Sequence, residues 1–201
     1  MTDCGCEPPA DAVSQGGVLV ALLAINASMF VVEGVAGWLG ESTGLLGDAL
    51  DMLADAAVYA VALYAVGRSE VAKASAARAS GVMQMALAGG VVADVARRAV
   101  LGSEPASIAM MGVGALALVA NLTCLALISR HRRGEVHMRA SWIFSRNDVL
   151  VNLGTIAGGA LVALLGSRIP DLAIGLFVSA AVFRGGVRIV RDASAERRQL
   201  A

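Results

Sequence analysis

The stretch GLLGDALDMLADAAVYAVALYAV, residues 44–66, is long and apolar enough to cross a membrane, yet three aspartates interrupt it. A helix of about 20 apolar residues spans a hydrocarbon core of about 30 Å. Asp48, Asp51 and Asp55 follow the spacing i, i+3, i+7, which places them along one face of such a helix. A charged residue near the bilayer centre costs at least about 2.5 kcal/mol. We therefore expect these carboxylates to line a polar pathway or to share a cation.

The composition of the whole chain is that of a membrane protein. Of its 201 residues, 57% are hydrophobic and 16% are charged, and the mean hydropathy is +0.72. This is too apolar for a soluble domain, whose surface is largely polar. The formal net charge is zero and aromatic residues make up only 4%. A protein that binds nucleic acid is therefore not expected, because it would need a basic surface or aromatic side chains for stacking.

Six windows of the sequence qualify as membrane helices. They are residues 17–39, 44–67, 79–100, 106–129, 141–166 and 169–190. We expect an all-α fold, an integral membrane bundle of six transmembrane helices. The expected organisation is an N-terminal tail at 1–16, the membrane domain at 17–190 and a short tail at 191–201, with no soluble C-terminal domain.

Basic residues are distributed unevenly between the two ends of this predicted bundle. Twelve Lys and Arg residues follow or end the second, fourth and sixth spans, whereas only Arg97, Arg98 and Arg168 end or follow the third and fifth. Because basic loops are retained in the cytoplasm, both termini are predicted to be cytoplasmic. Asp94 precedes Arg97 and Arg98 by three and four residues, which predicts an ion pair at the membrane interface.

A second polar cluster interrupts the fifth span in the stretch SRNDVLVN, residues 145–152. Asp148 and Asn152 are four residues apart and share a helix face, and Ser145 lies three residues before Asp148 on that face. Oxygen ligands from two helices are thus predicted to close around one cation. The alternative is that Arg146 pairs with Asp148 inside the bundle, although adjacent helical residues point about 100° apart.

Two other acidic residues have two interpretations each. Asp48 either joins the cation site or caps the start of its helix. Glu33, deep in the first span, either serves proton transfer or hydrates the pathway, or it is a protonated carboxyl group that is hydrogen-bonded to a neighbour.

These residues resemble the cation diffusion facilitator family of divalent-metal/proton antiporters. The second span has the pattern D-A-L-D-x-L-x-D, Gly154 follows Asp148 by six residues, and a basic loop separates the fourth and fifth of six helices. Further matching positions in the first span are Asn26, Glu33 and Gly37. The resemblance covers about residues 17–192.

The resemblance implies a metal site near the middle of the membrane. In the family, two ligands one turn apart on the second helix and two on the fifth hold the metal. By position, the second-helix pair is Asp51 and Asp55, and the fifth-helix aspartate is Asp148.

The histidine of the family's fifth helix falls on Phe144, which cannot bind metal. Asn147, three residues later and near the same face, is the expected substitute, with Ser145 and Asn152 behind it. A set of oxygen ligands is harder than one with imidazole, and it would tolerate Mn²⁺, Fe²⁺ or Co²⁺ alongside Zn²⁺ or Cd²⁺. The resemblance nevertheless favours zinc.

Four residues outside the spans are further candidate metal ligands. Cys4 and Cys6 in CGCE are either a weak capture point for a soft divalent ion or incidental cysteines of a disordered tail. His131 and His137 near the basic loop either bind metal or belong to a solvated loop.

The function implied by the resemblance is secondary transport. The chain is expected in the cell (inner) membrane as a multi-pass protein that exports divalent metal, zinc above all, in exchange for protons. It would need no prosthetic group. Its expected partners are metal ions, protons, the lipid bilayer and a second copy, joined through membrane helices. The alternatives are an exporter of broad specificity for Fe²⁺, Co²⁺, Mn²⁺ and Cd²⁺, a membrane-embedded metal-dependent enzyme, or a scaffold subunit; neither a Ser/His/Asp set nor an HExxH motif supports an enzyme.

Overall fold

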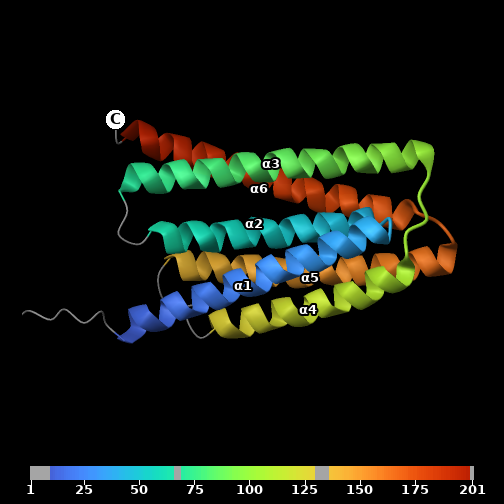
Figure 1. The fold of residues 1–201 in the computed structure, drawn as a ribbon, viewed down its shortest axis with the longest axis horizontal. Helices are drawn as coiled ribbons and strands as arrows, with labels where there is room; N and C mark the ends of the chain where they lie inside the picture. Colours follow the sequence, from blue (N-terminus) through green and yellow to red (C-terminus); the bar gives the residue numbers. More distant parts are fainter. Residues whose placement is uncertain (1–9, 66–68, 130–135, 200–201) are drawn as a thin grey trace, which may run out of the picture.

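The computed structural model describes residues 10–65, 69–129 and 136–199, with side chains described except at 10–15, 65, 73, 136–147 and 199. These residues form six α-helices and no strand. The helices are α1 (Ala10–Leu39), α2 (Thr43–Ala65), α3 (Glu70–Leu101), α4 (Ser107–Ser129), α5 (Val136–Leu165) and α6 (Ile169–Gln199). The predicted all-α bundle is confirmed, with successive helices antiparallel to one another (Figure 1).

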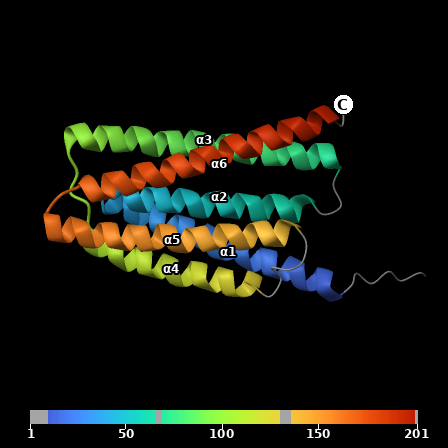
Figure 2. The same cartoon turned by 180° about the vertical axis from the view of Figure 1, so that it is seen from behind.

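Five helices in the described part of the chain are long and apolar enough to cross a membrane, namely α1, α3, α4, α5 and α6. α2 has 23 residues, but its three aspartates make it too charged to qualify on composition. The fold accommodates this helix by enclosing it: α2 contacts every other helix. Figures 1 and 2 show it between the α3–α6 pair and the group of α1, α4 and α5. The central position removes the aspartates from lipid, as their cost in hydrocarbon requires.

The exterior of the bundle is apolar and its interior is partly polar. No more than 33% of any apolar stretch is buried inside the bundle. Large apolar side chains face outward along the helices, among them Val100, Leu101, Ile108 and Leu164. This arrangement is the one expected for a protein that is surrounded by lipid, since soluble monomers rarely expose continuous apolar patches of more than a few hundred Å². The chain is therefore a multi-pass membrane protein.

Glycines allow α6 to pack closely against its neighbours. A Cβ atom added at Gly175 of α6 would lie 2.6 Å from the carbonyl oxygen of Thr43 in α2. A Cβ atom at Gly81 of α3 would lie 2.9 Å from the carbonyl oxygen of Gly186 in α6. Small residues at such crossings are a general means of bringing membrane helices together.

The first turn of α2 is fixed to α6 by one buried carboxylate. Asp171, which is fully buried, accepts hydrogen bonds from the Ser42 hydroxyl (2.5 Å), the Thr43 amide (2.8 Å) and the Gly44 amide (2.9 Å). A negative charge at this place stabilises the positive end of the helix dipole. Ser42 also accepts a bond from the Leu45 amide at 3.1 Å, so it caps the helix. The alternative that Asp48 caps α2 is therefore wrong.

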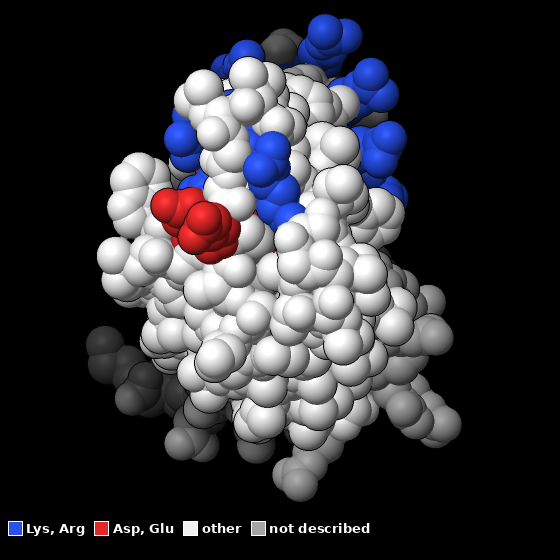
Figure 3. All heavy atoms as spheres, turned by 90° about the vertical axis from the view of Figure 1, so that its right-hand side faces the viewer, with Lys and Arg blue, Asp and Glu red and all other residues white. Residues whose placement is uncertain are grey.

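The two ends of the bundle differ in charge. α1 begins and α6 ends at the same end (Figures 1 and 2). The opposite end carries the short connections 40–42, 102–106 and 166–168, and its face is largely uncharged apart from a small acidic group and nearby basic side chains (Figure 3). The predicted ion pair is confirmed: Asp94 accepts from Arg97 at 2.7 Å and from Arg98 at 2.5 Å. That the termini are cytoplasmic stays a prediction.

Candidate metal centre

Acidic side chains from α2 and α5 meet inside the bundle. Asp55 and Asp148 are 8% and 7% exposed, whereas Asp51 is partly exposed. The Asp148 side chain contacts those of both Asp51 and Asp55. The structure thus brings together three of the residues that the sequence nominates as ligands, and it does so from two helices that are distant in the chain.

These three carboxylates interact in pairs rather than enclosing one point. Among the described side chains, no three from Asp, Glu, His and Cys are arranged to hold a metal ion together. One carboxylate oxygen of Asp55 is buried without a hydrogen-bond partner within the same described set. Two ionised carboxylates in contact repel each other unless a proton or a cation lies between them. The contact of Asp148 with Asp51 and Asp55 is therefore a place where either positive species is stabilised.

The expected fourth ligand lies where the backbone alone is described. α5 includes residues 136–147, so position 144 lies one helical turn before Asp148. The side chains of Phe144, Ser145, Arg146, Asn147 and His137 are outside the described residues, as are Cys4, Cys6 and His131. Their roles as ligands, and the pairing of Arg146 with Asp148, stay predictions.

Asp48 is held by an asparagine rather than by another acid. The Asn152 amide nitrogen donates to both carboxylate oxygens of Asp48, at 2.9 Å each. Asn121 of α4 donates to the Asn152 amide oxygen, also at 2.9 Å. All three side chains are at most 1% exposed. Because its oxygen is engaged with Asn121, Asn152 presents its NH₂ group to Asp48, so in this arrangement it orients the carboxylate instead of offering a metal ligand.

Glu33 lies close to this group without being bonded to it. Its side chain is fully buried, and it is near enough to Asp48 and Asp51 for their charges to act on it. Neither of its carboxylate oxygens has a hydrogen-bond partner among the described residues. The hydrogen bond to a neighbour that one interpretation required is thus not found in this part of the chain. An ionised carboxylate without a partner is costly in such a place, and the part of Glu33 in proton transfer or in hydrating the pathway stays a prediction.

Asn121 was missed by the sequence reasoning. It is the one amide side chain of α4, whose other polar residues are Ser, Thr and Cys, and a strongly polar residue in a membrane span faces the interior as a rule. The same signal applies to Asn26 of α1, whose amide nitrogen donates to the Leu22 carbonyl at 2.8 Å and lies 3.7 Å from the Cys124 sulfur. Together these residues extend the polar interior from α2 and α5 to α1 and α4.

Comparison with known proteins identifies a matching family and two related proteins that are named for the metals they transport. The sequence model of the family described as "Cation efflux transmembrane domain" matches residues 19–196. The chain is 23% identical over 187 residues to "Zinc transporter ZitB" of Yersinia pestis. It is 25% identical over 189 residues to "Cadmium, cobalt and zinc/H(+)-K(+) antiporter" of Bacillus velezensis. Each alignment covers 87% of this chain but only 60% of the relative, so the chain spans about 60% of the length of these curated relatives.

Proposed function

Since the chain belongs to the cation efflux family, we propose that it exports divalent metal cations from the cytoplasm across the cell (inner) membrane. The observation that carries this proposal is the contact of Asp148 with Asp51 and Asp55 inside the bundle. Buried carboxylates are expensive in a membrane and are retained where they bind ions or protons. A divalent ion is the substrate that offsets the charge of two such groups at once.

The proposed transport cycle uses these carboxylates alternately for metal and for protons. Metal binds Asp51, Asp55 and Asp148 while the bundle is open to the cytoplasm, with Asn147 as the fourth ligand. The partial exposure of Asp51 supports an approach to the site from its side of α2. The helices then rock, metal leaves on the outer side, and protons occupy the vacated carboxylates during the return. Because the described carboxylates touch only in pairs, binding draws them together around the ion.

The substrate we propose is zinc in the first place. Both relatives are named as transporters of zinc, and one is also named for cadmium and cobalt. Oxygen ligands without an imidazole also accept Mn²⁺, Fe²⁺ and Co²⁺. Broad specificity across these ions is therefore the alternative to zinc selectivity, and competition between them for transport decides between the two.

Two features of the assembly belong to the same proposal. We place both termini in the cytoplasm, which is supported by the excess of basic residues at the end where α1 begins and α6 ends. A cysteine-reactive reagent that does not cross the membrane should label a C-terminal tag only after the membrane is opened. We also propose a homodimer joined through membrane helices, which crosslinking in native membranes would detect as a species of twice the mass.

Reconstitution of the purified chain into liposomes tests the function. A zinc-sensitive dye and a pH-sensitive dye inside the vesicles should report zinc entry together with loss of internal protons. Zinc entry without any movement of protons would contradict the exchange mechanism but would still support metal transport. Absence of transport for every divalent ion offered, in vesicles that contain the folded protein, would contradict the function itself.

A further inference from the structure

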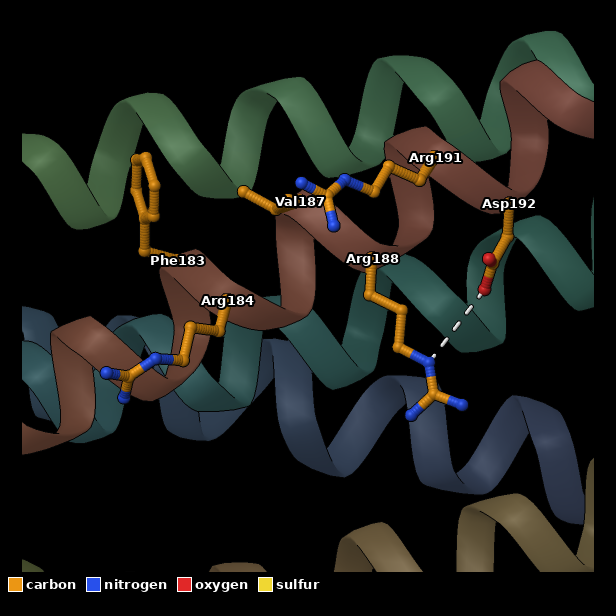
Figure 4. Close-up of a pocket in the computed structure, with 6 residues that line it drawn as sticks. All are labelled: Phe183, Arg184, Val187, Arg188, Arg191 and Asp192. Atoms are coloured by element: carbon orange, nitrogen blue, oxygen red, sulfur yellow. Dashed lines mark ion pairs between the residues drawn. The ribbon is translucent and has the colours of Figure 1, made fainter.

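A row of arginines occupies the C-terminal half of α6. Arg184, Arg188 and Arg191 follow the spacing i, i+4, i+7 and line a surface cavity of about 680 Å³. Phe183 and Val187 form the apolar part of its wall. In Figure 4, Arg184 and Arg188 extend from one side of α6 and Phe183 from the other. The metal site uses none of these residues.

The cavity has a surplus of positive charge. Its one acidic side chain, Asp192, lies 3.9 Å from Arg188, and the two side chains are 75% and 85% exposed. An ion pair so long and so exposed contributes little. Arg184 and Arg191 are exposed and have no hydrogen-bond or ion-pair partner among the described residues. At least two guanidinium groups are thus available to an anion.

The position of the cavity along α6 corresponds to the edge of the bilayer. α6 has 31 residues, which at about 1.5 Å per residue is roughly 46 Å, longer than a hydrocarbon core of about 30 Å. Counted from Ile169, the same rise places Arg184 at about 22 Å, Arg188 at about 28 Å and Arg191 at about 33 Å. With Ile169 near one face of the membrane, Arg188 and Arg191 lie at the edge of the hydrocarbon core on the other side. Arg184 lies about 8 Å inside that edge and reaches the headgroups with its long side chain extended toward the interface.

We propose that this part of α6 is a binding site for the phosphate headgroup of an anionic phospholipid. Arg184, Arg188 and Arg191 bind the phosphate, for which the planar guanidinium offers paired N–H donors. Phe183 and Val187 contact the first carbons of the acyl chains. The basic and apolar side chains of the cavity match the charged headgroup and the apolar acyl chains of a phospholipid. A free anion would contact only the basic side chains. The proposal does not depend on metal transport.

The same end of the bundle supplies a matched control. A smaller cavity of about 340 Å³ is lined by Arg78 of α3 with Ser194, Arg197 and Arg198 of α6. It carries three arginines but no large apolar residue, and its residues from α6 lie further along the helix. Removal of its three charges changes the net charge by the same amount as removal of the first three.

The experiment is native mass spectrometry of the full chain released from nanodiscs that contain equal parts of dioleoylphosphatidylglycerol and dioleoylphosphatidylcholine. The wild type should retain phosphatidylglycerol in preference. The triple variant Arg184→Gln, Arg188→Gln, Arg191→Gln should lose about tenfold or more in apparent affinity for it, since each basic residue near a membrane surface is worth about 1 kcal/mol. The control triple variant Arg78→Gln, Arg197→Gln, Arg198→Gln should stay within about twofold of the wild type.

Three results would overturn the proposal. Equal losses in the two triple variants would indicate a general attraction of basic residues to the membrane. Displacement of bound lipid by millimolar inorganic phosphate would assign the site to a free anion. A shift from dimer to monomer in the first variant, with lipid retention unchanged, would assign the surface to a second copy of the chain.

A second measurement covers the case in which the first triple variant does not fold. Wild-type protein is incubated with phosphatidylglycerol that carries a photoreactive group next to the phosphate. Crosslinks within residues 183–192 are expected. Crosslinks confined to other segments would contradict the site.

Discussion

Asn152 of α5 donates its amide nitrogen to both carboxylate oxygens of Asp48 in α2, at 2.9 Å each. Asn121 of α4 in turn donates to the amide oxygen of Asn152 at 2.9 Å, so hydrogen-bonded side chains join α4, α5 and α2. The amide of Asn152 is thereby fixed in one orientation, with its donor toward the acid. These hydrogen bonds give α2 a defined rotation about its axis, which in turn directs Asp51 and Asp55 toward α5.

The first prediction is that Asn152→Ala destabilises the protein by about 1–3 kcal/mol, because it leaves the buried Asp48 carboxylate and the Asn121 amide without partners. Unfolding of the purified protein in mixed micelles measures it. The control is Thr123→Ala, which removes an exposed hydroxyl that donates to the Val119 carbonyl of its own helix and should lose little. In combination with Asp48→Ala, the loss should be clearly smaller than the sum of the two single losses. Simple additivity would show that the two side chains do not interact.

A second prediction concerns the buried cap of α2. Asp171→Ala removes the acceptor of the Ser42, Thr43 and Gly44 hydrogen bonds, and we expect a loss of stability of about 2 kcal/mol or more. Asp192→Ala, on the same helix but 75% exposed, is the matched control and should change stability little. Equal unfolding midpoints for the two variants would mean that Asp171 does not anchor the helix.

The third prediction tests the close crossing of α2 and α6. Gly175→Ala places a methyl group 2.6 Å from the Thr43 carbonyl oxygen, so the helices must separate and stability must fall. Gly89→Ala in α3 meets nothing within 4 Å, and alanine is the better helix former by about 1 kcal/mol. Thermal unfolding should thus move in opposite directions for the two substitutions. A neutral Gly175→Ala would indicate a looser crossing.

The positions of the helices could be predicted from the sequence, because each span has an apolar stretch of sufficient length. The inward side of α2 could also be predicted, because its three aspartates share one face. The contacts that fix the helices to one another are harder to predict from the sequence. Polar residues indicate which side of α4 and of α5 faces inward, but they do not indicate which residues meet there. Asn121 and Asn152 are 31 positions apart, and Asp171 reaches residues 127 to 129 positions away in the chain. Such pairings depend on the packing of the whole bundle, which local spacing does not determine.

A fourth prediction addresses the ligand position occupied by Phe144. The backbone of α5 places it one turn before Asp148. Phe144→His adds an imidazole, which suits Zn²⁺ and Cd²⁺ better than Mn²⁺, so affinity for the first two should rise relative to the third. Transport should also fall as the pH drops through the range in which imidazole takes up a proton, because the protonated ring cannot bind metal. Unchanged metal preference and pH profile in liposomes would place residue 144 outside the site.

The most direct test of the central claim is zinc transport in liposomes by the variants Asp51→Asn, Asp55→Asn and Asp148→Asn. Each substitution keeps the shape of the side chain and removes the charge that binds the ion, so each should abolish transport while the protein still inserts and folds. The control is Asp94→Asn, which alters only the ion pair with Arg97 and Arg98 and should retain most of the activity. Near-normal zinc transport by the Asp51→Asn and Asp55→Asn variants would contradict the claim that these carboxylates carry the metal.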